Sequence, residues 1–269
     1  MIPEDVRTEI LQRLRSTETE HGVRVLLAVE SGSRAWGFAS PNSDFDVRFI
    51  YMRNPEWYQA VDLEERRDVI EYQIVDDIDL NGWDVRKALR LFWKSNPALV
   101  EWILSPITYI DESLFRGAAL ALLPEVYSPE KGIYHYRSMA KTNYRGYLRE
   151  PVVRLKKYFY VLRPLLAARW INKTGGAAPI EFEKLLALLQ DEPTVLSAVH
   201  LLLEQKRSAP ELGFAPAVPL LNTFIEAELG DDTVDVPHKL RTPKVVDLLN
   251  ELFHRVLEEH RANNSYQSF

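Results

Sequence analysis

Residues 32–47 read GSRAWGFASPNSDFDV, a Gly-Ser turn followed by two aspartates inside an apolar run. Asp44 and Asp46 are two positions apart, and residues two apart in a β-strand point to the same face. Their carboxylates are therefore expected to converge, and two hard oxygen ligands on one face suit Mg²⁺, which usually takes one or two carboxylates together with substrate phosphates. The turn at Gly32 and Ser33 can bring backbone N–H groups close to such phosphates. The stretch predicts a site for a metal-bound nucleoside triphosphate.

The flanking sequence connects the two halves of this stretch. A lone Asp-x-Asp usually lies on a solvated strand, and a lone Gly-Ser is usually a turn. Here residues 25–29 predict a buried strand that enters the turn, and residues 47–51 predict a strand that leaves it. Strand, Gly-Ser turn, short helix and a strand that opens with Asp-x-Asp resemble the signature of the DNA polymerase β-type nucleotidyltransferase superfamily. Residues 30–37, ESGSRAWG, are most similar to its RlaP group, which is linked to RNA repair.

This resemblance implies a two-metal site in which Asp44 and Asp46 hold Mg²⁺ or Mn²⁺ and take part in catalysis. It also implies a third carboxylate, on a later strand, that helps to orient or deprotonate the attacking hydroxyl. Asp79, which has apolar neighbours on both sides, is predicted for this catalytic and metal-binding role. Three other acids compete for it: Asp77, on the same face as Asp79; Glu71; and Asp84, whose structural alternative is to cap a helix.

The resemblance also assigns the phosphate tail to the turn. Gly32 suits a position where only a hydrogen fits beside a phosphate or a tight backbone, and Ser33 would offer its hydroxyl and N–H to the β- or γ-phosphate. Arg34 is predicted to reach the triphosphate, with an ion pair outside the site as the alternative. Ser43 is predicted to belong to the nucleotide site by bracing the loop before Asp44 as a turn residue.

A second informative segment is basic. Residues 131–173 contain eleven Lys and Arg but a single acid, Glu150, in a chain whose formal net charge is −6. Such segregation predicts polyphosphate or nucleic acid as a partner, with a solvated helix face as the alternative. Lys156, Tyr160 and Arg163 have the spacing of one helix face, so this run can grip a triphosphate and stack a base. Lys157 and Arg163 are predicted ligands of the triphosphate or the acceptor.

Composition excludes several classes of protein. The chain has no cysteine, which rules out disulfides and thiolate metal sites. The first residues, MIPED, lack the basic-then-apolar plan of a signal peptide, and no apolar run approaches the length of a membrane span. We therefore expect a cytoplasmic protein that has no membrane partner.

Apolar spacing and chain breaks predict an α+β protein. A small α/β catalytic lobe with a mixed sheet is expected over residues 1–115, an all-helical lobe over 116–262, and a loose tail over 263–269. In the first lobe we expect a helix at 4–20, strands at 23–29, 45–52 and 68–75, and a helix at 85–94 that Asp84 caps.

The sequence therefore favours a Mg²⁺- or Mn²⁺-dependent nucleotidyltransferase that moves a nucleoside monophosphate from a nucleoside triphosphate to a hydroxyl acceptor. The resemblance suggests that this acceptor is an RNA end. Transfer to a protein, transfer to a small molecule, and a non-catalytic RNA-binding module on the same scaffold remain the alternatives. The intact aspartates and Gly-Ser turn argue against the non-catalytic alternative.

Overall fold

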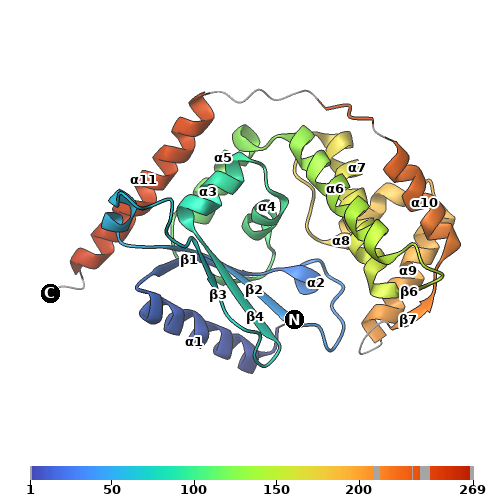
Figure 1. Ribbon diagram of the computed structural model, residues 1–269, viewed down its shortest axis with the longest axis horizontal. Coiled ribbons are helices and arrows are strands. Elements are labelled where there is room, and N and C mark those ends of the chain that lie inside the picture. Colours follow the sequence, from blue (N-terminus) through green and yellow to red (C-terminus); the bar gives the residue numbers. More distant parts are fainter. Residues whose placement is uncertain (1, 209–212, 232, 237–242, 267–269) are drawn as a thin grey trace.

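The computed structural model describes residues 2–208, 213–231, 233–236 and 243–266, with residues 263–266 described by their backbone alone (Figure 1). A five-stranded mixed sheet of order β3-β4-β2-β1-β5 forms the centre of one lobe. Its strands are β1 (Arg24–Glu30), β2 (Phe45–Met52), β3 (Val69–Glu71), β4 (Ile78–Asp84) and β5 (Thr108–Ile110). β2 is antiparallel to β1 and parallel to β4, so β2 and β4 start at the same edge of the sheet.

Side-chain alternation along β2 separates the two faces of the sheet. Val47, Phe49 and Tyr51 are buried in the cluster that also contains Leu14 of helix α1 (Glu4–His21). Ile50 and Met52 belong instead to the cluster on the opposite face. Because Asp46 and Arg48 have the same parity as Ile50, they project from that opposite face, at the start of the strand.

Four helices cover this opposite face: α3 (Val85–Trp93), α4 (Pro97–Leu104), α5 (Phe115–Val126) and α11 (Pro243–Tyr266). Side-chain caps fix two of their starts, as expected for Asp and Asn at the N-cap. The Asp84 carboxylate accepts a hydrogen bond from the Arg86 N–H, and the Asn96 side chain accepts one from the Leu99 N–H. The cap of α3 at Asp84 was predicted from the sequence, and the Asn96 cap fixes the start of α4 in the same way.

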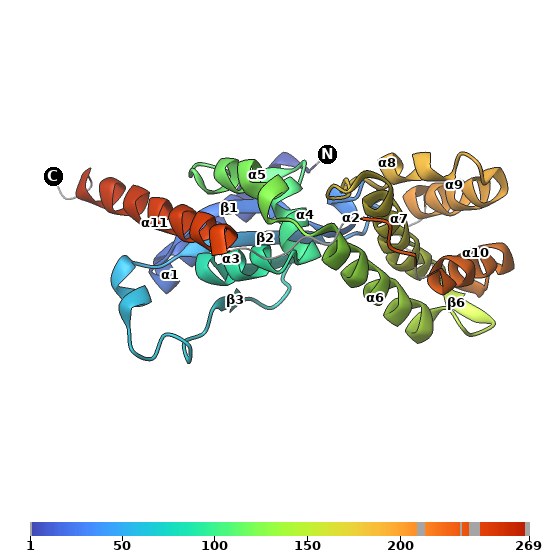
Figure 2. The ribbon, with the colours of Figure 1, turned by 90° about the horizontal axis from the view of Figure 1, so that it is seen from above.

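In the described residues, the second lobe is helical apart from one small two-stranded sheet (Figure 2). Its helices are α6 (Pro129–Tyr147), α7 (Phe159–Thr174), α8 (Phe182–Leu186), α9 (Pro193–Ser208) and α10 (Pro219–Gly230), with 3-10 turns η2 (Leu155–Tyr158) and η3 (Ala187–Leu189). The small sheet pairs β6 (Val152–Arg154) antiparallel with β7 (Phe214–Pro216), which comes much later in the chain. Helix α7 is the centre of this lobe, since its Leu162, Leu165 and Leu166 are buried among the other helices.

The predicted α+β class, with a mixed sheet and a helical part, is confirmed. Three details differ from the expectations. The strand expected over 68–75 is limited to β3 because a turn with positive φ at Asp76 and Asp77 reverses the chain into β4. Helices α5 and α11 pack on the sheet lobe, although the sequence predicted that residues 116–262 belong to the helical lobe. The sheet lobe is therefore built from two separate parts of the chain. Helix α11 also continues to Tyr266, into the segment expected to be loose, while residues 267–269 lie outside the described residues.

Candidate active site

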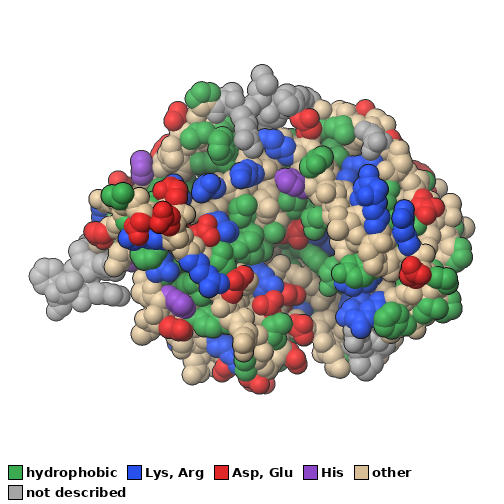
Figure 3. All heavy atoms as spheres, in the orientation of Figure 1, with side chains coloured by type: hydrophobic (Ala, Val, Ile, Leu, Met, Phe, Trp, Pro, Cys, Tyr) green, Lys and Arg blue, Asp and Glu red, His purple; other side chains and the backbone are tan. Residues whose placement is uncertain are grey.

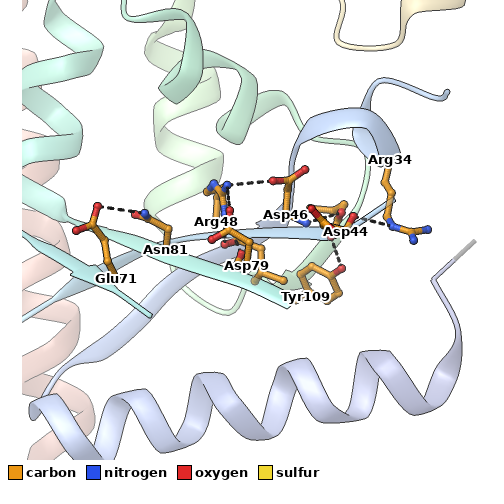
Figure 4. A network of polar contacts seen from close by, with 10 residues as sticks. Arg34, Asp44, Asp46, Arg48, Glu71, Asp79, Asn81 and Tyr109 are labelled. Carbon is orange, nitrogen blue, oxygen red and sulfur yellow. Dashed lines mark hydrogen bonds and ion pairs between the residues drawn. The ribbon is translucent and has the colours of Figure 1, made fainter. Parts of the chain in front are cut away.

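Two predicted aspartates lie next to each other where β2 and β4 begin. Asp46 and Asp79 are register partners in the parallel ladder, so their side chains leave the sheet on the same face. Both are partly accessible, with 30% and 26% of the side chain exposed. Asp44 comes just before β2, is exposed, and lies close to Asp46 in Figure 4. The ladder therefore gathers acids from two distant parts of the sequence at one edge of the sheet.

Arg48 links two of these carboxylates. Its Nη2 atom lies 3.1 Å from Asp46 Oδ1 and 2.6 Å from Asp79 Oδ2, and its Nη1 donates to the Asp79 carbonyl at 2.8 Å. Sequence reasoning missed Arg48, although the alternation that pairs Asp44 with Asp46 also places residue 48 on their face. The guanidinium supplies the positive charge that two neighbouring carboxylates need.

The donor chemistry of this site fits a hard divalent cation, since carboxylate oxygens are the ligands that Mg²⁺ and Mn²⁺ prefer. Within the residues that the structure describes, however, no three acidic or histidine side chains are arranged to hold a metal ion as they stand. In the structure, Asp46 and Asp79 are instead both paired with the guanidinium of Arg48. A metal ion would have to replace this contact.

Burial and like charges make Asp46 an unusual acid. Burial is the largest cause that raises the pKa of Asp46, and the negative charges of Asp79 and Asp44 raise it further, while Arg48 lowers it. An additional cation beside Asp46 would stabilise its ionised form, because its positive charge offsets the cost of burying the carboxylate and the repulsion from Asp79 and Asp44.

Glu30 supports the site from behind. It is fully buried at the end of β1, where its Oε1 accepts the backbone N–H of Asp46 at 3.0 Å and its Oε2 accepts the hydroxyl of Tyr109 at 2.5 Å. Burial raises the pKa of Glu30 to about 7, although both hydrogen bonds act to lower it. Glu30 was not among the predicted site residues; it fixes the backbone that carries Asp46.

Gly32 is the point where the turn meets the aspartates. Its φ of +58° lies in the left-handed region, which favours glycine. A Cβ atom at this position would overlap the carboxylate of Asp46. The N–H of Ser31 also donates to the Asp46 carbonyl at 2.8 Å. The turn therefore lies directly against the acid, and only glycine leaves room for a ligand there.

Known proteins match most of this chain. Residues 6–255 match the RNA repair pathway DNA polymerase beta family, RlaP. The chain belongs to this family. It is 42% identical over 256 residues to the uncharacterized protein YcgL of Bacillus subtilis (strain 168), a match that covers 94% of this chain and 97% of YcgL. A solved structure, that of a nucleotidyltransferase-like protein from Exiguobacterium sibiricum 255-15, is 12% identical with a TM-score of 0.33, covering 82% of this chain and 74% of that one.

In this RlaP-family chain, two of the predicted nucleotide ligands brace the loop before Asp44. The Arg34 guanidinium donates to the carbonyl of Ser43 at 2.5 Å and to that of Asp44 at 3.1 Å, and it lies 3.8 Å from the ring centre of Phe45. The Ser43 hydroxyl accepts the Ser40 N–H at 2.9 Å. Figure 4 shows Arg34 pointing away from the carboxylate cluster. The structure thus gives Arg34 a bracing contact to this loop and gives Ser43 a contact that fits its predicted bracing role, while the reach of Arg34 to the triphosphate stays a prediction. Ser33, half-buried on the short helix α2 (Gly32–Ala35), remains a predicted phosphate ligand.

The rival acids have other partners or positions. Asp84 caps α3 and accepts the Tyr58 hydroxyl at 2.8 Å. Glu71 pairs with Arg67 at 2.7 Å and lies toward the far end of the strands in Figure 4. Asp77 is exposed in the positive-φ turn before β4, where its carbonyl accepts the Phe45 N–H. Among the four acids, Asp79 alone is the register partner of Asp46.

Tyr160 of the helical lobe lies near the aspartates, and Lys157 lies beside the Tyr160 ring. Partial burial raises the pKa of Tyr160, and the charges of Asp46 and Asp44 raise it further, so this side chain lies within electrostatic reach of both acids. The Lys157 ammonium lies 3.9 Å from the ring centre of Tyr147 and 5.0 Å from that of Tyr160. Burial lowers the pKa of Lys157, and the neighbouring Lys156 and Arg154 lower it further. An anion close to the Lys157 ammonium would therefore stabilise its positive charge.

Arg163 has a structural partner that the helix-face prediction did not foresee. Its side chain is 3% exposed, and its Nη1 lies 2.9 Å from Glu101 Oε1. Glu101 of α4 also accepts the Tyr136 hydroxyl at 2.8 Å and the indole N–H of Trp36 at 3.1 Å. The burial corrects the prediction that Arg163 binds the triphosphate, because its guanidinium is enclosed and already paired. Instead the network ties α4, α6 and α7 to the turn that carries Gly32.

A hollow separates the two lobes on the face drawn in Figure 3, with acidic side chains on the sheet side and basic ones across from them. Figure 1 shows in the same orientation that the start of β2 and α2 lie below this hollow. In the described residues, no helix is both long and apolar enough to cross a membrane.

Proposed function

We propose that this chain is a metal-dependent nucleotidyltransferase that moves a nucleoside monophosphate from a nucleoside triphosphate to a hydroxyl group at an RNA end. The observation that carries the proposal is the register pairing of Asp46 with Asp79 beside the positive-φ turn at Gly32. Membership of an RNA repair family of the polymerase β type supports both the reaction and the acceptor.

In this proposal Asp44, Asp46 and Asp79 hold Mg²⁺ or Mn²⁺ once Arg48 releases its contacts. When bound, the ions would supply charge neutralisation for the triphosphate and its leaving group. The acceptor oxygen forms a bond to the α-phosphorus while the bond from that phosphorus to the bridging oxygen breaks, and pyrophosphate leaves. The proton of the acceptor hydroxyl passes to Asp79, which lies at the accessible end of its strand.

The turn and the helical lobe contribute to binding. Gly32 allows the phosphate tail to approach the backbone, and Ser33 offers its hydroxyl and N–H. Lys157 lies beside the rings of Tyr147 and Tyr160, and burial and its basic neighbours lower its pKa, so a phosphate oxygen bound there would stabilise its charge. Tyr160, 38% exposed, offers a ring on which a base can stack.

The test is transfer of label from each α-labelled nucleoside triphosphate to short RNAs with different ends, with Mg²⁺ or Mn²⁺. Asp46→Asn should abolish transfer, because it removes one ligand charge and keeps the side-chain volume. Asp77→Asn is the matched control, since Asp77 lies in an exposed positive-φ turn where asparagine is well tolerated. Label on protein alone would favour protein modification. Transfer that survives Asp46→Asn would overturn the proposed metal site.

A further inference from the structure

A second surface of the helical lobe is built like an anion-binding groove. It has a volume of about 740 Å³ and lies along α6, closed on one side by Leu229 and Val234 near the end of α10. None of the predicted site residues lines it. Four basic residues do, Lys131, Arg137, Lys141 and Arg145, against one acid, Glu130. Figure 3 shows Lys and Arg side chains gathered over this part of the lobe.

The spacing along α6 suits a repeating anion. Arg137, Lys141 and Arg145 are four residues apart, so they lie on one face of the helix at intervals of about 6 Å along its axis. Lys141 and Arg145 are exposed. Ser138 and Thr142 lie on the same side of the groove and offer hydroxyl donors. A row of cations at regular intervals fits a phosphodiester backbone better than it fits a single compact anion.

An aromatic residue in the same groove points to nucleic acid. Tyr134 is 72% exposed, which is unusual for a large ring, and it precedes Arg137 by one helical turn. Single-stranded nucleic acids bind where a positive groove follows the backbone and aromatic rings stack with the bases. An acidic peptide would use the cations but would gain little from an exposed tyrosine.

We infer that this groove binds a single-stranded segment of the RNA acceptor, at a distance from the end that reacts. The inference rests on the proposed function for the identity of the acceptor. It gives the basic segment two separate tasks: Lys157, beside Tyr160, binds the triphosphate, and the α6 row holds the acceptor strand.

The experiment measures binding of a fluorescently labelled single-stranded RNA to the full chain by anisotropy, over a range of salt concentrations and without nucleotide. Lys141→Glu/Arg145→Glu should weaken binding by about tenfold or more and reduce the slope of log K against log salt by roughly 1.4, because two phosphate contacts are lost. The matched control is Arg15→Glu/Arg255→Glu, which makes the same charge change at two exposed helical arginines on the sheet lobe. It should bind RNA like the parent chain.

Three outcomes would contradict the inference that this groove binds RNA. The first is equal weakening by both double variants. The second is displacement of the RNA by polyglutamate as effectively as by unlabelled RNA, which would favour an acidic peptide. A parent chain that transfers label to RNA while the α6 variant binds RNA normally would also remove the groove and leave the proposed reaction intact. Conversely, RNA binding that depends on α6 in a chain without transfer activity would support the groove and count against the proposed reaction.

Discussion

Glu101→Gln should destabilise the protein strongly, because it removes the charge partner of Arg163. The two side chains are 11% and 3% exposed, and Nη1 lies 2.9 Å from Oε1. The remaining contacts of Arg163 to the Ile180 carbonyl are long, at 3.3 and 3.4 Å, so they cannot replace the carboxylate. Breaking one side of a buried pair costs about 3–5 kcal/mol, since the other charge stays buried without compensation.

The free energy of unfolding from urea titrations measures this cost. Glu101→Gln/Arg163→Met should recover most of the loss, because neither charge is then buried alone. Glu181→Gln is the matched control: Glu181 pairs with Lys184 at 2.7 Å, but the two side chains are 33% and 61% exposed, so we expect a loss below about 1 kcal/mol. A Glu101→Gln loss as small as that of the control, or a double variant weaker than the single one, would refute the reasoning.

Three further predictions concern the site and its support. Arg48→Gln should tighten Mn²⁺ binding several-fold in a calorimetric titration, since the competing cation at the aspartates is gone; unchanged or weaker binding would contradict this. Gly32→Ala should abolish nucleotide binding in a fluorescence titration, because the new Cβ overlaps Asp46. Gly37→Ala, with φ +85° and no atom within 4 Å of the added Cβ, should cost only backbone strain of about 1–2 kcal/mol and keep nucleotide binding. Burial raises the pKa of Asp84 from 3.8 to about 6, so between these values the folded protein binds more protons than the unfolded chain and stability falls as the pH rises. Asp84→Asn retains an N-cap, and it should reduce the loss of stability between pH 4 and 6 in thermal unfolding curves. If the variant loses as much stability over this range as the parent chain, other titrating groups cause the loss.

The sequence predicts the site well where the determining contacts are local. The turn, the two strands and the position of Asp44 and Asp46 follow from spacing within a few residues. Asp79 needed only one further assumption, that its strand lies next to β2, and the parallel ladder brings the residue into register with Asp46. The cap at Asp84 is equally local, which is why that acid could be assigned a structural alternative from the sequence.

Predictions became unreliable where a side chain's partner lies far along the chain. Arg163 has the spacing of a ligand-binding face, but Glu101, 62 positions away, determines its role. Helix α11 has the pattern of an amphipathic helix, yet nothing in that pattern tells which lobe its apolar face will cover. Leu249, Leu252 and Val256 pack on the sheet lobe. Periodicity gives the apolar side of an element, whereas tertiary packing decides its neighbour.

The burial of Arg163 makes the two lobes interdependent at the site. Glu101 accepts hydrogen bonds from Arg163 on α7 and from Trp36, which follows the Gly32 turn. The Arg163 guanidinium also lies 4.5 Å from the ring centre of Trp36. The same helix α7 carries Tyr160, which touches Trp36 edge to face with ring centres 5.8 Å apart. The position of Tyr160 relative to the aspartates is thus set by the buried network around Glu101, which lies outside the proposed set of metal and nucleotide ligands. A variant that keeps its fold but loses this network should therefore bind nucleotide less tightly in a fluorescence titration, although Asp44, Asp46 and Asp79 are unchanged, because the ligands are then no longer held in position.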